Sequence, residues 1–204
     1  GRNLILFVAM LGVFGVETTS FAALFAAAGV AIGMAWSGLL SNFAAGVLMV
    51  VLRPFKKGDF ISAGGQLGTV EEIGLFVTTI NTMDGVRTFV GNNAVFSGTI
   101  QNFTANPARR VELKAQLDNT ADVAQAIQLL RAGLASIPNV AKSPAPEVDI
   151  LEFTLAGPVL AVRPHCHNDH YWQVYFETNK LIRDELGRAG FPVPRPAYRL
   201  QTEQ

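Results

Sequence analysis

The chain has 204 residues, 50% of them hydrophobic, and its formal net charge is zero. A neutral chain gives no electrostatic support for nucleic-acid binding, and the single cysteine, Cys166, excludes an internal disulfide framework. The charge is unevenly distributed, because Arg2 and Glu17 are the only charged residues before Arg53, and 30 of the 32 charged residues therefore lie in the last 152 positions. This partition predicts an apolar membrane segment followed by a water-soluble body of one or two small domains.

Residues 2–16 are apolar but shorter than the roughly 20 residues that a membrane-spanning helix needs. We expect them to be the end of a spanning helix that starts before Gly1. A signal peptide is the alternative, although the segment lacks a polar, small-residue cleavage region. Residues 12–20 combine two glycines with three hydroxyl residues, which predicts a turn at the membrane surface and a cap for a new helix.

Residues 18–52 are a run of 35 residues without a charged side chain. An unbroken helix of this length would be about 52 Å long, whereas the hydrocarbon core of a bilayer is about 30 Å thick. We therefore expect a membrane helix that bends at glycine or leaves the membrane. Small residues in the first half indicate close packing, against a helix of the same chain or around the axis of an oligomer. They are Ala23, Ala26, Ala27, Gly29, Ala31 and Gly33.

The second half of this run has apolar residues at positions 39, 40, 43, 44, 47, 48 and 51. This spacing is typical of an amphipathic helix that lies along an interface or against a soluble domain. Pro54 ends the helix, and three positive residues, Arg53, Lys56 and Lys57, lie beside that end. By the positive-inside rule, the body that follows is cytosolic.

From residue 57 to residue 103 the pattern changes to short runs of residues that favour β-strands. These runs cover residues 60–61, 67–73, 76–80 and 88–90, with glycine-containing turns between them. The Asp84-Gly85 pair is a strong hairpin signal. Short strands spaced so closely, within fewer than 50 residues, predict a small barrel.

Residues 111–204 read as alternating strands and helices. We expect strands at 111–117, 148–153 and 159–164, helices from about 120 to 136 and at 171–189, and an extended segment from 191 onward. The order β-α-β-β-α-β predicts a ferredoxin-like α+β domain.

The run GVETTSFAALFAAAGVAIGMAWSGLLSNFAAGVLMVVLRPFKKGDFI, continued by GTVEEIGLFVTTINTMDG, TIQNFT and AGFPVPRP, resembles the small-conductance mechanosensitive channel family. The likeness covers nearly all of the chain and is most specific over residues 29–55. It implies a membrane α-helical pore segment, a cytosolic β-barrel of the Sm/SH3-like type and an α+β ferredoxin-like domain. The implied boundaries are 1–16 for the end of a preceding transmembrane helix, 17–55 for a kinked pore-lining helix, 56–107 for the β-barrel middle domain, 108–190 for the αβ domain and 191–204 for a terminal strand.

The resemblance also implies a function. It points to a homoheptameric, multi-pass mechanosensitive ion channel in the bacterial cytoplasmic (inner) membrane, surrounded by lipid and with its C-terminal body in the cytosol. Membrane tension would open it, and it would pass ions and small solutes with weak selectivity to relieve hypo-osmotic stress.

The family pattern assigns roles to individual residues of the pore segment. It places the hydrophobic pore gate at Val30 and Met34, which share one helix face, the kinks at Gly38 and Gly46, and a polar residue, Asn42, between the kinks. The helix packing seam falls on the six small residues named above, and Arg53, Lys56 and Lys57 form the membrane-interface cluster. Two departures from the family stand out: Met34 replaces a stiffer branched residue, and Val90-Gly91-Asn92 lacks the family's proline.

All three histidines, His165, His167 and His170, lie within six residues. Imidazole suits Zn²⁺, so the cluster favours a rival function, a metal- or ligand-regulated membrane channel or binding module. On a strand Cys166 would point away from its neighbours, and no fixed fourth ligand is evident. We therefore favour a polar strand end or a subunit contact, and we expect no metal and no cofactor.

Nothing in the sequence predicts an enzyme. The adjacent Glu71 and Glu72 diverge on a strand, which is poor geometry for paired acid–base work. The glycines at 64, 65 and 68 do not open a helix, so they do not form a phosphate loop. A third hypothesis is a membrane-anchored scaffold without a conducting pore.

Overall fold

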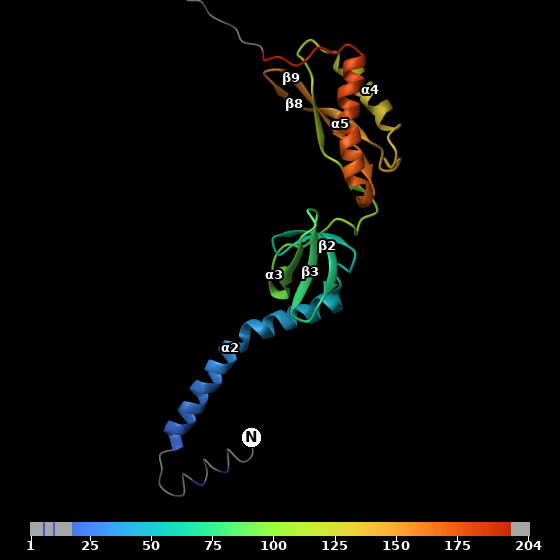
Figure 1. Ribbon diagram of the computed structural model, residues 1–204. Helices are drawn as coiled ribbons and strands as arrows, with labels where there is room; N and C mark the ends of the chain where they lie inside the picture. Colours follow the sequence, from blue (N-terminus) through green and yellow to red (C-terminus); the bar gives the residue numbers. More distant parts are fainter. Residues whose placement is uncertain (1–5, 7–9, 11–17, 197–204) are drawn as a thin grey trace, which may run out of the picture. The chain divides into compact units, whose positions relative to one another are not determined.

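The computed structural model describes residues 6, 10 and 18–196. The chain divides into two compact units, Gly1–Asn102 and Phe103–Gln204 (Figure 1). Apart from Leu6 and Met10, the segment expected to end a preceding helix lies outside the described residues, as does the turn up to Glu17.

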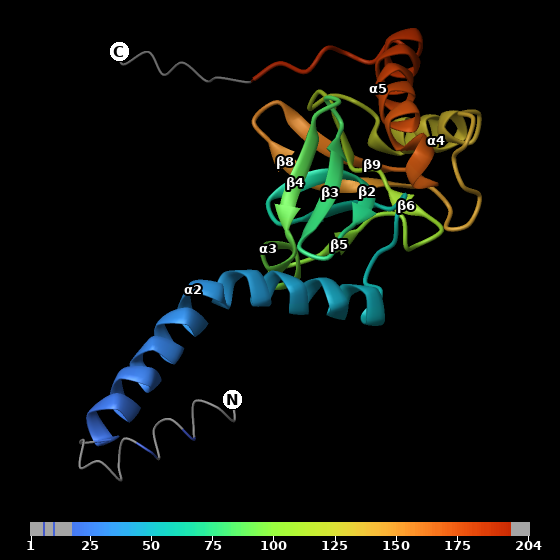
Figure 2. The ribbon, with the colours of Figure 1, turned by 60° about the horizontal axis from the view of Figure 1, so that its bottom comes forward.

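Helix α2 spans Thr18–Leu52, the same residues as the uncharged run. Figures 1 and 2 show that the helix is bent between its two ends. The hydroxyl of Ser37 donates to the carbonyl oxygen of Met34 at 2.8 Å, and Nδ2 of Asn42 donates to the carbonyl oxygen of Gly38 at 2.9 Å. Serine bonds of this kind bend helices. The bend itself is observed. Its assignment to Gly38 stays a prediction.

Five antiparallel strands follow α2 in the spatial order β4-β3-β2-β1-β5. They are β1 (Phe60–Ala63), β2 (Gln66–Ile73), β3 (Val77–Thr82), β4 (Arg87–Gly91) and β5 (Gln101–Asn102), with the short helix α3 (Asn92–Phe96) after β4. Between β3 and β4, the amide of Gly85 donates to the carbonyl oxygen of Thr82 at 3.0 Å, and the φ of Gly85 is +83°. Glycine adopts this angle without strain, so the expected hairpin is confirmed.

The core of this β domain includes a residue of α2. Met49 is fully buried together with Ile61, Ile80 and Val95. Because burying such a side chain contributes about 1.5–3 kcal/mol, the end of α2 is an integral part of the domain.

The second unit is an α+β sandwich built on the antiparallel sheet β7-β9-β8. Its elements are β6 (Arg109–Arg110), β7 (Leu113–Gln116), α4 (Val123–Leu134), β8 (Glu147–Thr154), β9 (Gly157–Arg163), β10 (His165–Cys166), the 3-10 helix η1 (Asn168–His170) and α5 (Tyr171–Arg188). Asp122 caps α4, because its side chain accepts the amide of Gln125 at 3.0 Å. The core lies between sheet and helices and contains Leu113, Leu130, Val148, Leu160, Val162 and Val174.

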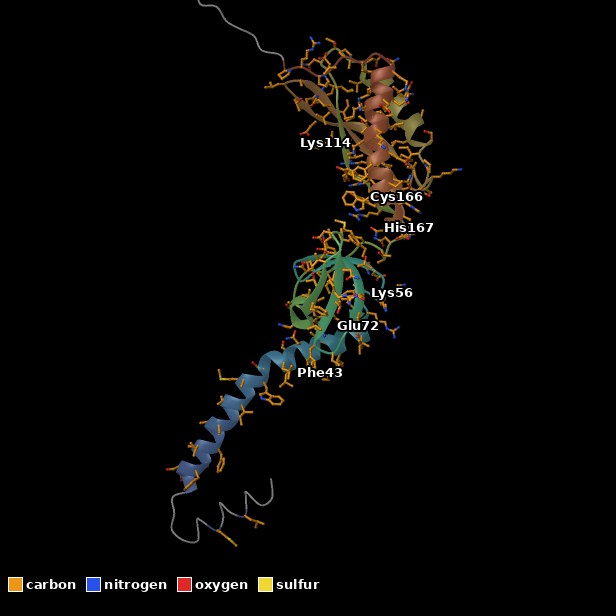
Figure 3. All side chains as sticks on the ribbon, viewed as in Figure 1. Phe43, Lys56, Glu72, Lys114, Cys166 and His167 are labelled. Carbon is orange, nitrogen blue, oxygen red and sulfur yellow. The ribbon has the colours of Figure 1, made fainter. Side chains whose placement is uncertain are left out.

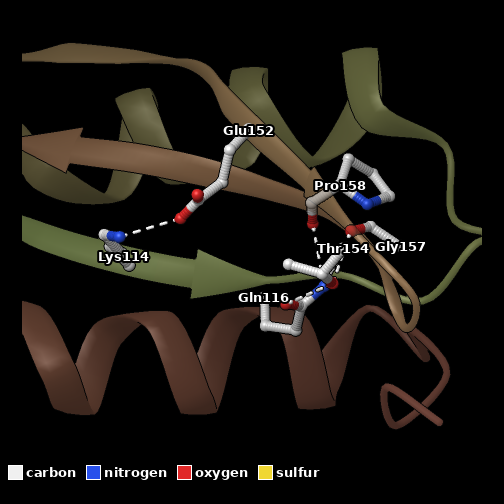
Figure 4. A network of polar contacts seen from close by, with 6 residues as sticks. All are labelled: Lys114, Gln116, Glu152, Thr154, Gly157 and Pro158. Carbon is white, nitrogen blue, oxygen red and sulfur yellow. Dashed lines mark hydrogen bonds and ion pairs between the residues drawn. The ribbon is translucent and has the colours of Figure 1, made fainter. Parts of the chain in front are cut away.

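Polar side chains link the three strands of this sheet (Figure 4). Nζ of Lys114 lies 2.8 Å from Oε1 of Glu152. Nε2 of Gln116 donates to the carbonyl oxygens of Gly157 and Pro158, and the hydroxyl of Thr154 donates to Oε1 of Gln116 at 3.0 Å. Cross-strand pairs of this kind help to fix the register of the strands.

The expected terminal strand is not found in the part that the structure describes. Residues 191–196 form no strand, and residues 197–204 lie outside the described residues. Pro192, Pro194 and Pro196 have no amide hydrogen to donate to a sheet. The observed order within the described part of the unit is therefore β-α-β-β-α with a small extra sheet. The α+β class is confirmed, while the terminal strand expected at 191–204 stays a prediction.

Candidate functional site

The first half of α2 has no protein partner within the described part of this chain. Every side chain from 19 to 40 is exposed, including Val30 at 63% and Met34 at 71%. A Cβ added at Gly29, Gly33 or Gly38 would meet nothing within 4 Å. Residues 19–52 are long and apolar enough to cross a membrane. This surface therefore needs lipid or other protein copies against it.

The structure places the predicted gate and seam residues together on this exposed stretch. Val30 and Met34 are four positions apart and so lie one helical turn apart on one face. The six small residues of the predicted seam are all exposed, and their roles as a packing seam stay predictions.

The second half of α2 lies against the β domain instead. Ala45 is 4% exposed, Met49 is fully buried, and Gly46 between them is buried as well. Phe43 contacts Phe76 with ring centroids 6.1 Å apart (Figure 3). Met49 lies four positions after Ala45 and three after Gly46, so these residues share one helix face. This face is docked on the turn after β2 and on α3.

A buried polar network lies under this docked face. The hydroxyl of Thr78 donates to Oδ1 of Asn92 at 2.8 Å, and Nδ2 of Asn92 donates to the carbonyl oxygen of Gly74 at 2.8 Å. The backbone amide of Asn92 donates to the carbonyl oxygen of Phe76 at 2.9 Å. Thr78 and Asn92 are both fully buried. Such satisfied networks make a local structure unique and rigid.

One hydrogen bond joins α2 directly to α3. The amide of Asn93 donates to Oδ1 of Asn42 at 2.9 Å, across 51 positions of sequence. A Cβ on Gly91 would lie 2.9 Å from the same Oδ1. Gly91 has φ −57°, close to the angle that proline imposes, so the loss of the family's proline leaves this backbone conformation in place.

The family resemblance points to Asn42, but no sequence signal points to Thr78 or Asn93. Asn92 is noted only because the residue before it, Gly91, replaces the family's proline. Polar residues at strand ends usually face solvent, and only their mutual hydrogen bonds explain the burial of Thr78 and Asn92.

The basic cluster follows the end of α2. Arg53 adopts φ +50°, and its amide donates to the carbonyl oxygen of Met49 at 2.9 Å. The backbone amide of Lys56 donates to Oδ2 of Asp59 at 3.0 Å. Arg53, Lys56 and Lys57 are all exposed, and Figure 3 labels Lys56. Their role at a membrane interface stays a prediction.

The histidine cluster is divided among different structural roles. His165 lies in β10, while Nδ1 of His167 accepts the amide of Asp169 at 3.3 Å and caps η1, which contains His170. Within the described residues, no group of three or more His, Cys, Asp or Glu side chains is placed to hold a metal. The metal-regulated alternative therefore has no support from the geometry.

Arg109 is the centre of a different contact in the same unit. Its guanidinium lies over the rings of Phe103 and Tyr171, with its carbon 4.4 Å and 3.8 Å from their centres. Nη1 also donates to Oδ1 of Asn168 at 3.0 Å. Cys166, paired opposite Arg109, is fully buried. Burial raises the pKa of the Cys166 thiol, although the positive charge of Arg109 partly opposes this.

Residues 38–105 match the family description "Mechanosensitive ion channel, beta-domain". They include the docked half of α2 and the whole β domain. An uncharacterized MscS family protein of Buchnera aphidicola subsp. Schizaphis graminum is 36% identical over 189 residues, which cover 93% of this chain and 67% of that protein. The chain belongs to the MscS family.

Two further similarities agree with this membership. The small-conductance mechanosensitive channel of Edwardsiella ictaluri is 34% identical over 170 residues, which cover 83% of this chain and 59% of that protein. The crystal structure of Helicobacter pylori MscS in its closed state has the same fold, with a TM-score of 0.88, 24% identity, and coverage of 98% of this chain and 80% of that one. The chain thus spans about two thirds or less of the length of the two relatives compared by sequence. The family resemblance and the fold class expected from the sequence are confirmed.

Proposed function

We propose that this MscS family chain is the pore-forming part of a mechanosensitive ion channel that membrane tension opens. One observation carries the proposal: α2 exposes an uncharged, mostly apolar first half, while its second half is built into a β domain. A helix of this kind can line a pore in the bilayer and still be held by a soluble body. The name of the Edwardsiella ictaluri relative supports the same activity.

The proposed conduction path is closed by apolar side chains. In a symmetric ring of chains, Val30 and Met34 would form two apolar collars one helical turn apart. An ion that enters such a constriction loses its hydration without a polar replacement, so the collars block current without a plug. The seam of alanine and glycine residues allows the helices of neighbouring chains to approach closely, and the resemblance implies a ring of seven.

Tension would open this pore because it favours the state with the larger area in the membrane plane. Tilting of the first halves of α2 would separate the collars until water enters. Ions and small solutes would then pass with weak selectivity and relieve hypo-osmotic stress. The basic residues after α2 support a cytosolic location for the body by the positive-inside rule. In this proposal the chain is part of a multi-pass protein of the bacterial inner membrane, without a catalytic role and without a cofactor. The domain boundaries at 1–16, 17–55, 56–107, 108–190 and 191–204 belong to this proposal.

Recording from membrane patches tests the proposal. The full-length protein, reconstituted in liposomes, should give discrete current steps when suction is applied, and the steps should vanish when suction is released. Native mass measurement should show a ring. Patches that contain the protein yet carry no tension-dependent current would support the scaffold alternative, and a monomer or dimer in the mass spectrum would exclude the collar model.

A further inference from the structure

Gly46 is a position where the backbone of α2 closely approaches the β domain. A Cβ added there would lie 2.5 Å from Nδ2 of Asn92, 2.6 Å from the carbonyl oxygen of Leu75 and 3.3 Å from that of Gly74. Real Cβ atoms essentially never come within 3.0 Å of a non-bonded heavy atom. By contrast, the same atom at Gly29, Gly33 or Gly38 would meet nothing within 4 Å. Among the glycines of α2, contacts within the described part of this chain therefore require the lack of a side chain at this position alone.

The surface opposite Gly46 cannot easily withdraw. The Asn92 side chain is fully buried and is held by Thr78 on one end and by the Gly74 carbonyl on the other. The Leu75 carbonyl belongs to the backbone of the tight turn between β2 and β3, which the amide of Gly74 closes by donating to the carbonyl oxygen of Val77 at 2.8 Å. Both obstacles are fixed within the β domain. An added methyl group would therefore move α2 rather than its neighbours.

We propose that Gly46 is a docking position, which permits the second half of α2 to seat on Asn92 and the Gly74-Leu75 turn, and that a side chain at this position shifts the chain toward an undocked α2. This role differs from that of a kink. A kink requires glycine for its flexibility, so alanine would stiffen α2 in any state. A docking position requires the absence of the Cβ, so alanine would weaken one specific contact and leave the helix itself intact.

The amide of Asn93 reports on docking directly, because its acceptor is Oδ1 of Asn42 on α2. The amide of Val70 is an internal reference, because its acceptor is the carbonyl oxygen of Asp59 within the β domain, at 2.9 Å. Residue-resolved hydrogen exchange on the full chain in lipid can follow both amides. The measurement needs no ion current, so its outcome is independent of whether the chain conducts.

Four variants separate docking from flexibility. Gly46→Ala should raise the exchange rate of the Asn93 amide by about tenfold or more and leave that of Val70 unchanged. The swap Ala45→Gly with Gly46→Ala keeps one glycine in the same turn but places a Cβ at position 46, so it should behave like Gly46→Ala. Gly38→Ala should behave like the parent, because it adds no atom at the contact. Ala45→Gly alone removes one buried methyl group from the docked face, so it should raise the exchange rate of Asn93 less than the swap does.

Three outcomes would overturn the proposal. The first is parent-like exchange of Asn93 in the swap, which would mean that a glycine anywhere in this turn is sufficient. The second is an equal rise in Ala45→Gly alone, which would assign the contact to the Ala45 methyl group. The third is an equal rise at Val70 in Gly46→Ala, which would mean that the residue stabilises the whole domain instead of the docking of α2.

Discussion

The guanidinium carbon of Arg109 lies 3.8 Å from the centre of the Tyr171 ring. The same carbon lies 4.4 Å from the centre of the Phe103 ring, the first residue of the second unit. Arg109 thus ties the start of this unit to the first turn of α5. The residues before β6 contain no regular element, and this contact contributes to their order.

We expect Tyr171→Leu to destabilise the second unit by about 1–2 kcal/mol, because it removes a cation–π contact of this strength. Tyr171→Phe is the matched control, since it keeps the ring and loses only the hydroxyl. Thermal unfolding of the full chain in detergent measures the effect. Equal midpoints for the Leu and Phe variants would mean that the cation–π contact contributes nothing measurable.

Replacing Val30 by Ser should lower the tension needed to open the channel or produce a leak. The hydroxyl makes the apolar collar easier to wet, so an ion loses less hydration at the constriction. Patch recordings at measured tension compare the variant with the parent, and Met34→Leu is the control because both residues are apolar and similar in volume. An unchanged threshold without a leak would move the gate away from Val30.

Gly38→Ala should slow closing or inactivation more than it alters the opening threshold. Alanine stabilises a helix interior by about 1 kcal/mol relative to glycine, and the added Cβ meets nothing within 4 Å. The change therefore acts on helix flexibility without a clash. The measurement is the time course of current after a tension step. Parent-like kinetics would remove the proposed hinge from this residue.

A bulky residue in the packing seam should impair assembly. Ala27→Leu adds a side chain where neighbouring helices are expected to approach most closely, whereas Ala27→Gly keeps the position small. Native mass spectrometry of the two variants in detergent should show partial loss of the ring for the leucine variant only. Intact rings for Ala27→Leu would place the seam on another helix face.

The carboxylate of Glu112 should make a small, pH-dependent contribution to stability. Partial burial raises its pKa, but the hydrogen bond from Arg163 and the positive charges of Arg110 and Arg163 outweigh this and lower it. A group whose pKa is lowered by folding stabilises the folded state above its unfolded pKa, and this contribution is lost as pH falls through the folded pKa. About half of the side chain is exposed, so we expect less than about 1 kcal/mol.

The measurement for Glu112 is the difference in unfolding free energy between the parent and Glu112→Gln. This difference should be largest near neutral pH and should shrink toward zero as pH falls below the lowered folded-state pKa of Glu112, where the carboxyl is protonated and both chains are uncharged at this position. A difference that stays constant over this range would assign the effect of Glu112 to packing.

The sequence predicts those features that depend on local patterns. The bounds of α2 follow from the absence of charge between Glu17 and Arg53, and the hairpin follows from Asp84-Gly85 because only particular residues fit its backbone angles. These signals reside in neighbouring residues, so no knowledge of tertiary contacts is needed to interpret them.

The contacts of the candidate site could not be predicted in the same way. Asn92 and Thr78 are polar and would be assigned to the surface, yet they are fully buried because each satisfies the other. The three histidines are close in sequence, but one of them is used to cap η1. The segment at 191–196 has an extended sequence, but extended chain becomes a strand only where a partner strand accepts its hydrogen bonds.

Buried Cys166 makes the chain a convenient background for chemical labelling. It is the single cysteine of the sequence, it is fully buried, and burial raises the pKa of its thiol. Thiol reagents attack the thiolate at accessible positions, so a cysteine introduced on exposed α2 would react first without any native residue being replaced. Maleimide labelling of Val30→Cys, with and without applied tension, would then report directly whether water reaches this face of the helix.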